Sequence, residues 1–210
     1  MKWVSPVIYW LKARGNDSIH SNKKIPMFDE LRHLYQYVDE TMRMLYEKYP
    51  DEVMCKKGCS DCCHAVFDLS LIEALYLLSV FGYRSEELQQ RVLSRCEPAL
   101  KKWESLMTTG EDLSRARIRC PLLNDTGECD CYEARPVNCR TYGVPTVING
   151  AAHVCGLSRF QKGISYPTVN LDPLQKGLHE YSVKAGGQEL GAKRQPVAAI
   201  LLFPEQFTII

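Results

Sequence analysis

Four cysteines lie within nine residues of this chain, in the segment CKKGCSDCC that begins at Cys55 and ends with the adjacent pair Cys62 and Cys63. The chain of 210 residues has ten cysteines in all. A disulfide framework tends to spread its cysteines so that each bridge closes a loop and constrains the unfolded chain. A crowded group instead indicates ligands gathered around one small object, and thiolates bind zinc or hold iron–sulfur clusters.

A second set of cysteines is spread over residues 120–155 at irregular intervals. Structural zinc sites are usually built from pairs of Cys-x2-Cys knuckles. Only Cys59 and Cys62 have that spacing here, and the second set has none. The spacing therefore leaves zinc and an iron–sulfur centre both open and favours iron slightly. The second set consists of Cys120, Cys129, Cys139 and Cys155.

The cellular compartment bears on whether these cysteines bind metal or form disulfides. Lys2 precedes a short apolar run that Pro6 interrupts, and no small-residue cleavage site follows, so we expect no signal peptide and a cytoplasmic location. No apolar segment reaches the length of a membrane span. A net charge of +1 gives no electrostatic footprint for nucleic acid or an anionic membrane. The expected partner is a metal ion, and a protein partner is left open.

The sequence outside the clusters predicts a mainly α-helical fold with few or no strands. From Phe28 to Leu45, apolar residues recur at intervals of three and four, which predicts a helix that ends by Pro50. Ser70 and Glu73 form a capping-box pattern that starts a second helix. A third helix is expected over residues 85–107, where Pro98 is a candidate kink.

The remaining segments predict how the helices are arranged. Residues 115–155 are rich in Gly, Pro, Asn and Cys, which indicates an irregular, ligand-bearing loop region around which the helices pack. An amphipathic stretch near residues 173–184 precedes a glycine-rich segment, 186–191, that we expect to be flexible. We expect a loosely attached extension over residues 1–24 and one metal-binding domain over residues 25–210.

Three motifs together identify a resemblance to a known family. CKKGCSDCC, followed by RIRCPLLNDTGECDCYEARPVNCRTYG and a later Cys155, resembles the YkgJ-like cysteine-cluster family, whose CxxCxxCC domain is described as zinc- or iron-chelating. The family pattern is a crowded group ending in Cys-Cys, a CPLL-type motif, and Gly-x-Cys-x-Ile-Tyr-x-x-Arg-Pro-x-x-Cys-Arg. The resemblance covers about half of the chain. It implies metal ligands at Cys55, Cys59, Cys62, Cys63, Cys120, Cys129, Cys139 and Cys155.

The other candidates near the motifs have competing interpretations. Cys131 stands where the family usually has isoleucine, so the resemblance makes Cys129 the ligand and Cys131 an additional thiol. Cys96 is expected to be a small buried hydrophobe in the third helix. His64 and His153 are alternative ligands or partners of ligands. The arginines of the last motif, Arg135 and Arg140, would either offset thiolate charge or pair with carboxylates to hold the loop.

Two enzyme classes enter as alternatives. The spacing Cys55-x3-Cys59-x2-Cys62 resembles the cluster loop of radical S-adenosylmethionine enzymes, but the alternating strands and helices of their barrel are missing here. A related cysteine region occurs in flagellin lysine N-methylases, which implies a cofactor-dependent protein-modifying enzyme as an alternative to a metal-binding module. An electron-transfer protein is a third possibility. No glycine-rich loop for a methyl donor follows a predicted strand, so the sequence leaves enzyme activity open.

Overall fold

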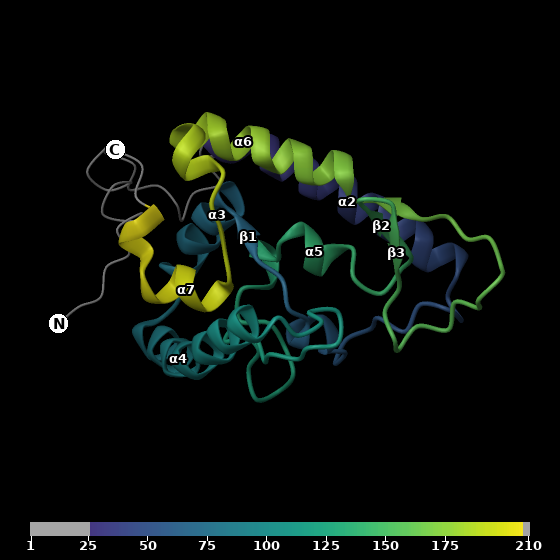
Figure 1. Ribbon diagram of the computed structural model, residues 1–210, viewed down its shortest axis with the longest axis horizontal. Coiled ribbons are helices and arrows are strands. Elements are labelled where there is room, and N and C mark those ends of the chain that lie inside the picture. Colours follow the sequence, from purple (N-terminus) through teal and green to yellow (C-terminus); the bar gives the residue numbers. More distant parts are fainter. Residues whose placement is uncertain (1–25, 208–210) are drawn as a thin grey trace.

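The computed structural model describes residues 26–207, and the extension expected over residues 1–24 lies outside them. The described part of the chain is mainly α-helical, as predicted (Figure 1). Its strands are two or three residues long and form two small sheets, of order β1-β5 and β3-β2-β4. The helices are α2 (Asp29–Lys48), α3 (Leu71–Phe81), α4 (Glu86–Thr109), α5 (Val137–Arg140), α6 (Asp172–Gly191) and α7 (Val197–Leu202). The strands are β1 (Leu69–Ser70), β2 (Thr146–Ile148), β3 (Ala151–His153), β4 (Val169–Asn170) and β5 (Arg194–Gln195).

Helix α2 corresponds to the helix that the apolar pattern of the sequence predicts. A 3-10 turn, η1 (Pro26–Phe28), leads into it, and it ends before Pro50. Its buried side chains recur at helical intervals on one face, as the helical period requires. This face packs into the core of the domain. The buried side chains are Leu31, Tyr35, Val38 and Met42.

Helix α3 is the most buried helix of the fold and begins at the predicted capping box. Glu73 Oε2 accepts hydrogen bonds from the backbone N–H and the hydroxyl of Ser70, at 3.1 and 2.8 Å. The next orphan N–H, that of Ile72, donates to Ser182 Oγ of α6 at 3.1 Å. Unpaired amides at the start of the helix are thus satisfied by side chains from within and from outside the helix.

Helix α4 runs without interruption through Pro98, so the expected kink does not divide it. Ser85 is its N-cap and accepts a hydrogen bond from Leu88 N at 3.3 Å. Gly110 ends it in the left-handed conformation, with φ of 67°. Val92 and Cys96 are fully buried on the face that packs towards α7.

Residues 115–155 are mainly irregular, as expected, but this region and the segment after it contain short regular elements. Helix α5 lies near the middle of the molecule, and β2 and β3 form an antiparallel hairpin at one end (Figure 1). Strand β4 joins this hairpin in parallel, with Thr146 opposite Val169. The cysteine-rich loop region therefore has its own short helix and small sheet.

The glycine-rich segment 186–191 is not the flexible linker that its composition suggested. It belongs to α6, with one break in helical geometry at Gly187, whose φ is 74°. Gly191 is buried, and a Cβ there would lie 2.6 Å from the Cα of Val183, so the glycine permits close backbone packing. Composition alone does not reveal this close packing, and for that reason the same glycines suggested a flexible segment.

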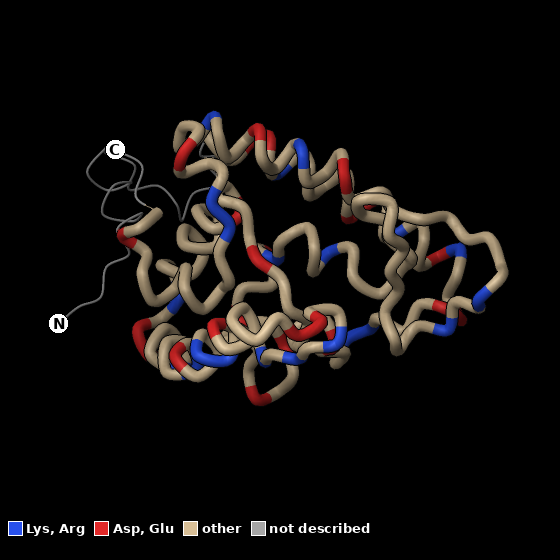
Figure 2. The backbone as a smooth tube through the Cα atoms, in the orientation of Figure 1, with Lys and Arg blue, Asp and Glu red and all other residues tan. Residues whose placement is uncertain are grey.

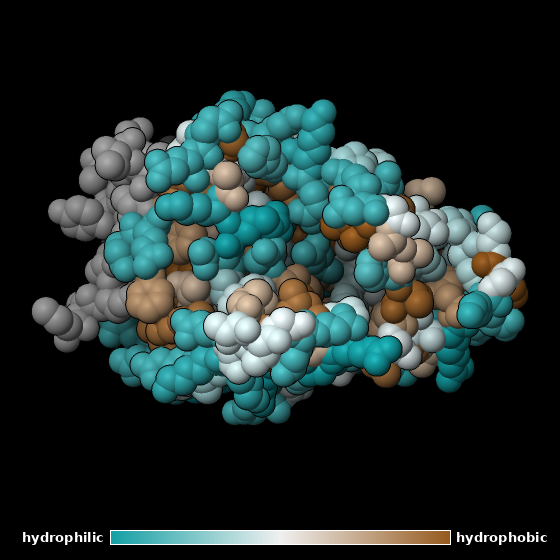
Figure 3. Space-filling model, viewed as in Figure 1, coloured by the Kyte–Doolittle hydropathy of each residue, from teal (hydrophilic) through white to brown (hydrophobic). Residues whose placement is uncertain are grey.

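Helices α6 and α4 lie on opposite sides of the molecule, with α3 and α7 between them (Figure 1). Charged residues are spread along α6 and α4 (Figure 2), and the surface over both is mainly hydrophilic (Figure 3). Brown patches are visible at the end that carries the β2–β3 hairpin (Figure 3). The exposed large hydrophobic residues of the chain that follows β3 include Val154, Leu157 and Ile164. Within residues 26–207, none of the helices combines the length and apolarity needed to cross a membrane.

Candidate metal centre

Backbone hydrogen bonds bring the two cysteine-bearing segments together. The crowded cluster forms a 3-10 turn, η2 (Asp61–His64). Cys120 N donates to Cys63 O at 2.7 Å, and Ile118 N donates to His64 O at 3.0 Å. The chain that precedes the CPLL motif therefore runs beside the end of the cluster.

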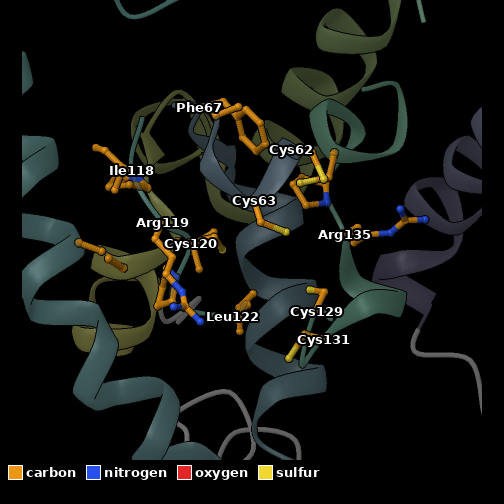
Figure 4. A pocket seen from close by; sticks show the side chains of 18 of the residues that line it. Cys62, Cys63, Phe67, Ile118, Arg119, Cys120, Leu122, Cys129, Cys131 and Arg135 are labelled. Atoms are coloured by element: carbon orange, nitrogen blue, oxygen red, sulfur yellow. The ribbon is translucent and has the colours of Figure 1, made fainter. Parts of the chain in front are cut away.

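Six cysteines line one cavity of about 70 Å³. They come from three segments: the η2 turn, the stretch around residues 120–131, and α5 (Figure 4). Five of the eight expected ligands, drawn from both sequence groups, are thus neighbours around one space, and Cys131 joins them. The six are Cys62, Cys63, Cys120, Cys129, Cys131 and Cys139.

The rest of the cavity wall is apolar and comes from the helical core. Phe67, Trp103 and Leu122 contribute large side chains, and α3 and α7 add smaller surfaces. Such a wall lowers the local dielectric and limits the access of water, which strengthens charge interactions inside the cavity. The helices therefore supply much of the apolar wall of the cavity, and the irregular loops supply most of the thiols.

The thiols in the cavity interact strongly with one another. The neighbouring thiols of Cys139 and Cys63 lower the pKa of Cys62. The same contacts, together with burial, raise the pKa of Cys63 and of Cys139. Burial also raises the pKa of Cys120 to about 12. A metal cation would stabilise the thiolate forms that this environment otherwise disfavours.

The other three predicted ligands gather at a second place. Burial and the neighbouring thiols of Cys59 and Cys155 raise the pKa of Cys55 to about 12. Cys155 Sγ lies 3.4 Å from Asp61 Oδ2, to which it donates. Tyr142 donates to the same carboxylate oxygen at 2.9 Å. The crowded cluster is therefore divided between two locations: Cys62 and Cys63 lie with the cavity cysteines, and Cys55 and Cys59 lie near Cys155.

Cys55 is held against a glycine. Cys55 Sγ lies 3.5 Å from Tyr142 O, to which it donates. Gly143 has φ of +102°, and a Cβ at this position would lie 2.2 Å from Cys55 Sγ. Glycine at residue 143 thus serves both the backbone conformation and the close approach of the thiol.

The two motif arginines have different roles. Arg140, almost buried, donates to Asp39 Oδ2 at 2.6 Å and to Glu133 O at 2.7 Å, and it stacks 3.9 Å from the ring of Tyr35. It holds α5 against α2. The guanidinium of Arg135 lies 3.7 Å over the ring of Tyr132, and its charge helps to lower the pKa of Cys62.

The remaining candidates are placed as follows. Cys96 is fully buried and donates to Val92 O at 3.4 Å, which fits its expected structural role. Cys131, expected to be an additional thiol, lies in the cavity wall, where burial raises its pKa to about 12. His64 Nδ1 is 3.0 Å from Ser60 O, and His153 is an exposed residue of β3. Sequence reasoning did not single out Asp61, although its place inside CKKGCSDCC was a signal for it.

The thiols suit a thiophilic metal, but they are arranged around a cavity and not around a single point. Within residues 26–207, no three Cys, His, Asp or Glu side chains converge on one point as the ligands of a single bound ion do. The thiols instead surround the cavity from several sides (Figure 4). Soft thiolates in this number suit zinc or iron and do not suit magnesium or calcium.

Comparisons with known proteins agree with this chemistry. The family model CxxCxxCC, described as "Putative zinc- or iron-chelating domain", matches residues 54–156. No curated protein and no solved structure matches the chain significantly. The matched segment contains all eight expected ligands together with Cys96 and Cys131. Residues 54–156 of this chain belong to the CxxCxxCC family of zinc- or iron-chelating domains.

Proposed function

We propose that the protein binds iron as an iron–sulfur cluster in the cysteine cavity. The observation that carries this proposal is that six thiols line an apolar cavity of about 70 Å³. A four-thiolate zinc site needs its sulfurs about 2.3 Å from a single point. A cluster brings its own sulfides, which occupy the space between the ligands, so thiols around a cavity suit it better.

Four thiolates suffice for one cluster, and the cavity offers more than four. The pKa values of Cys62, Cys63 and Cys139 depend on one another through their neighbouring thiols, and Cys120 and Cys129 line the same cavity. We assign the ligands to these five and place Cys131, whose thiol meets Arg84, in the wall of the cavity. The second group of thiols, at Cys55, Cys59 and Cys155, is a further metal position in this proposal, with Asp61 beside it.

The test is anaerobic purification followed by absorption spectroscopy and by analysis of iron, sulfide and zinc. We expect a brown protein with broad absorption near 400 nm, the usual range for thiolate-bound clusters, and with iron and sulfide in about equal amounts. A colourless protein with stoichiometric zinc would show that the centre is a zinc site. A folded protein with oxidised thiols and no metal would contradict metal binding altogether.

Matched cysteine variants locate the centre. The double variant Cys62→Ser with Cys139→Ser should lose most of the absorption, because both residues line the cavity and only three of the five assigned thiols would remain. Cys96→Ser is the control, since Cys96 is buried in α4 and bonds to its own helix. Equal iron content in the two variants would rule out the assigned ligand set.

A further inference from the structure

A larger cleft lies beside the cysteine cavity. Residues 65–67 line both spaces and form the partition between them. The cleft has a volume of about 310 Å³. Small-molecule sites occupy about 300–1,000 Å³, so this volume suits a small organic ligand and excludes a folded partner.

One part of the cleft wall is apolar. Val66 and Phe67 contribute from the partition, and Val144, Ile148 and Leu171 contribute from the segment around β2 and β4. An apolar surface of this kind gains free energy by covering a hydrocarbon or aromatic group, at about 25 cal/mol for each Å² removed from water. The ligand should therefore carry an apolar body.

The polar part of the wall favours an anion. Arg117 lines the cleft, and the described residues that line it include no aspartate or glutamate; Asp61, which pairs with Arg117, lies outside this lining. Asn138 also lines the cleft, and its Oδ1 accepts from Gln175 Nε2 at 3.0 Å. This bond leaves the amide nitrogen of Asn138 as the donating end of the side chain. A cation and an N–H donor near an apolar wall are the groups that recognise a carboxylate.

Asp61 fixes Arg117 in place. Arg117 Nη2 donates to Asp61 Oδ1 and, at 3.3 Å, to Asp61 O. The carboxylate of Asp61 is largely buried and also accepts from Tyr142 and Cys155. A guanidinium has five N–H donors in a rigid plane, and these two bonds use Nη2 alone. Arg117 is therefore pre-oriented, while about half of its side chain stays exposed to a ligand.

We propose that this cleft binds a small amphipathic carboxylate, with the carboxylate on Arg117 and the apolar body against Val66, Phe67 and Ile148. The site goes beyond metal binding and does not depend on which metal fills the neighbouring cavity. Its position places the ligand next to the thiol of Cys155, which lines the same cleft.

The experiment is isothermal titration calorimetry on the metal-bearing protein with three carboxylates and their neutral amides: benzoate, phenylacetate and hexanoate. At least one carboxylate should bind about tenfold more tightly than its amide, which corresponds to one charge-assisted hydrogen-bonded pair. Arg117→Met should abolish this preference. Arg115→Gln is the control, because Arg115 is exposed, pairs with Asp112 and lies outside the cleft.

Two results overturn the proposal: no carboxylate binding more tightly than its amide, or an unchanged preference in Arg117→Met. If Arg117→Met does not fold, Val154→Trp decides, because it adds bulk to a half-exposed position in the cleft wall. Unchanged binding in that variant also overturns the proposal. Metal analysis of the same samples keeps the two proposals separate, since a zinc protein that binds carboxylates contradicts only the iron assignment.

Discussion

The carboxylate of Glu73 accepts a hydrogen bond from the backbone N–H of Val137 at 2.8 Å, across 64 positions of sequence. Glu73 is the capping-box residue of α3, and Val137 is the first residue of α5, which carries Cys139. One buried side chain thus caps the helix at the centre of the core and fixes the helix that delivers a thiol to the cavity.

Glu73→Gln should destabilise the fold by about 1–3 kcal/mol, because an amide nitrogen would face the N–H of Ser70 or of Val137 and leave a buried donor unpaired. Urea unfolding of the two proteins under identical metal loading measures this difference. Glu97→Gln, at an exposed position of α4, is the control and should change stability by less than about 0.5 kcal/mol. Equal effects of the two substitutions would show that the Glu73 bonds contribute little.

Stability should depend on pH through Glu73. Burial raises its pKa above the ordinary value of 4.5, although the bonds from Val137 and Ser70 oppose the shift. The folded state therefore holds this proton more tightly than the unfolded state. Its contribution is fully present below about pH 4.5 and is lost as the pH rises through the folded pKa. The stability difference between the wild type and Glu73→Gln, measured from pH 4 to 8, should shrink as the pH rises, and a constant difference would contradict the shift.

Gly143→Ala should disturb the second group of thiols. The added Cβ would meet Cys55 Sγ at 2.2 Å, and the φ of +102° disfavours any side chain. Gly163→Ala is a matched control, because its φ is +88° and nothing lies within 4 Å of an added Cβ. Both variants carry backbone strain of about 1–2 kcal/mol, but only Gly143→Ala should lower the metal content. Metal analysis of both variants decides, and an equal loss would assign the effect to strain alone.

Arg140→Lys should destabilise the domain by about 2 kcal/mol, although the charge is kept. Lysine cannot reproduce the bonds to Asp39 and two backbone carbonyls together with the stacking on Tyr35. Arg43→Lys is the control, since Arg43 is exposed and pairs within α2 with Glu40 and Glu47. Thermal unfolding should show a lower Tm for Arg140→Lys only. Similar Tm values would mean that Arg140 acts as a surface charge.

The helices could be predicted from local signals, and the arrangement of the thiols could not. The apolar period of α2, the capping box at Ser70 and the N-cap at Ser85 are all encoded within a few residues. The division of the crowded cluster, with Cys62 facing Cys139 and Cys55 near Cys155, depends on contacts between distant segments. Spacing along the chain suggested two groups by proximity in sequence, whereas the fold pairs members of one group with members of the other.

The backbone bond between Cys63 and Cys120 has a consequence for how metal enters the protein. Closing the loop between residues 63 and 120 costs conformational entropy, and in this fold main-chain hydrogen bonds offset part of that cost independently of any metal ligand. A metal that binds here should therefore have less chain to order than the sequence spacing implies. Loading should accordingly be limited by the delivery of metal or sulfide, and a centre lost to oxidation can be rebuilt on the same scaffold once its thiols are reduced.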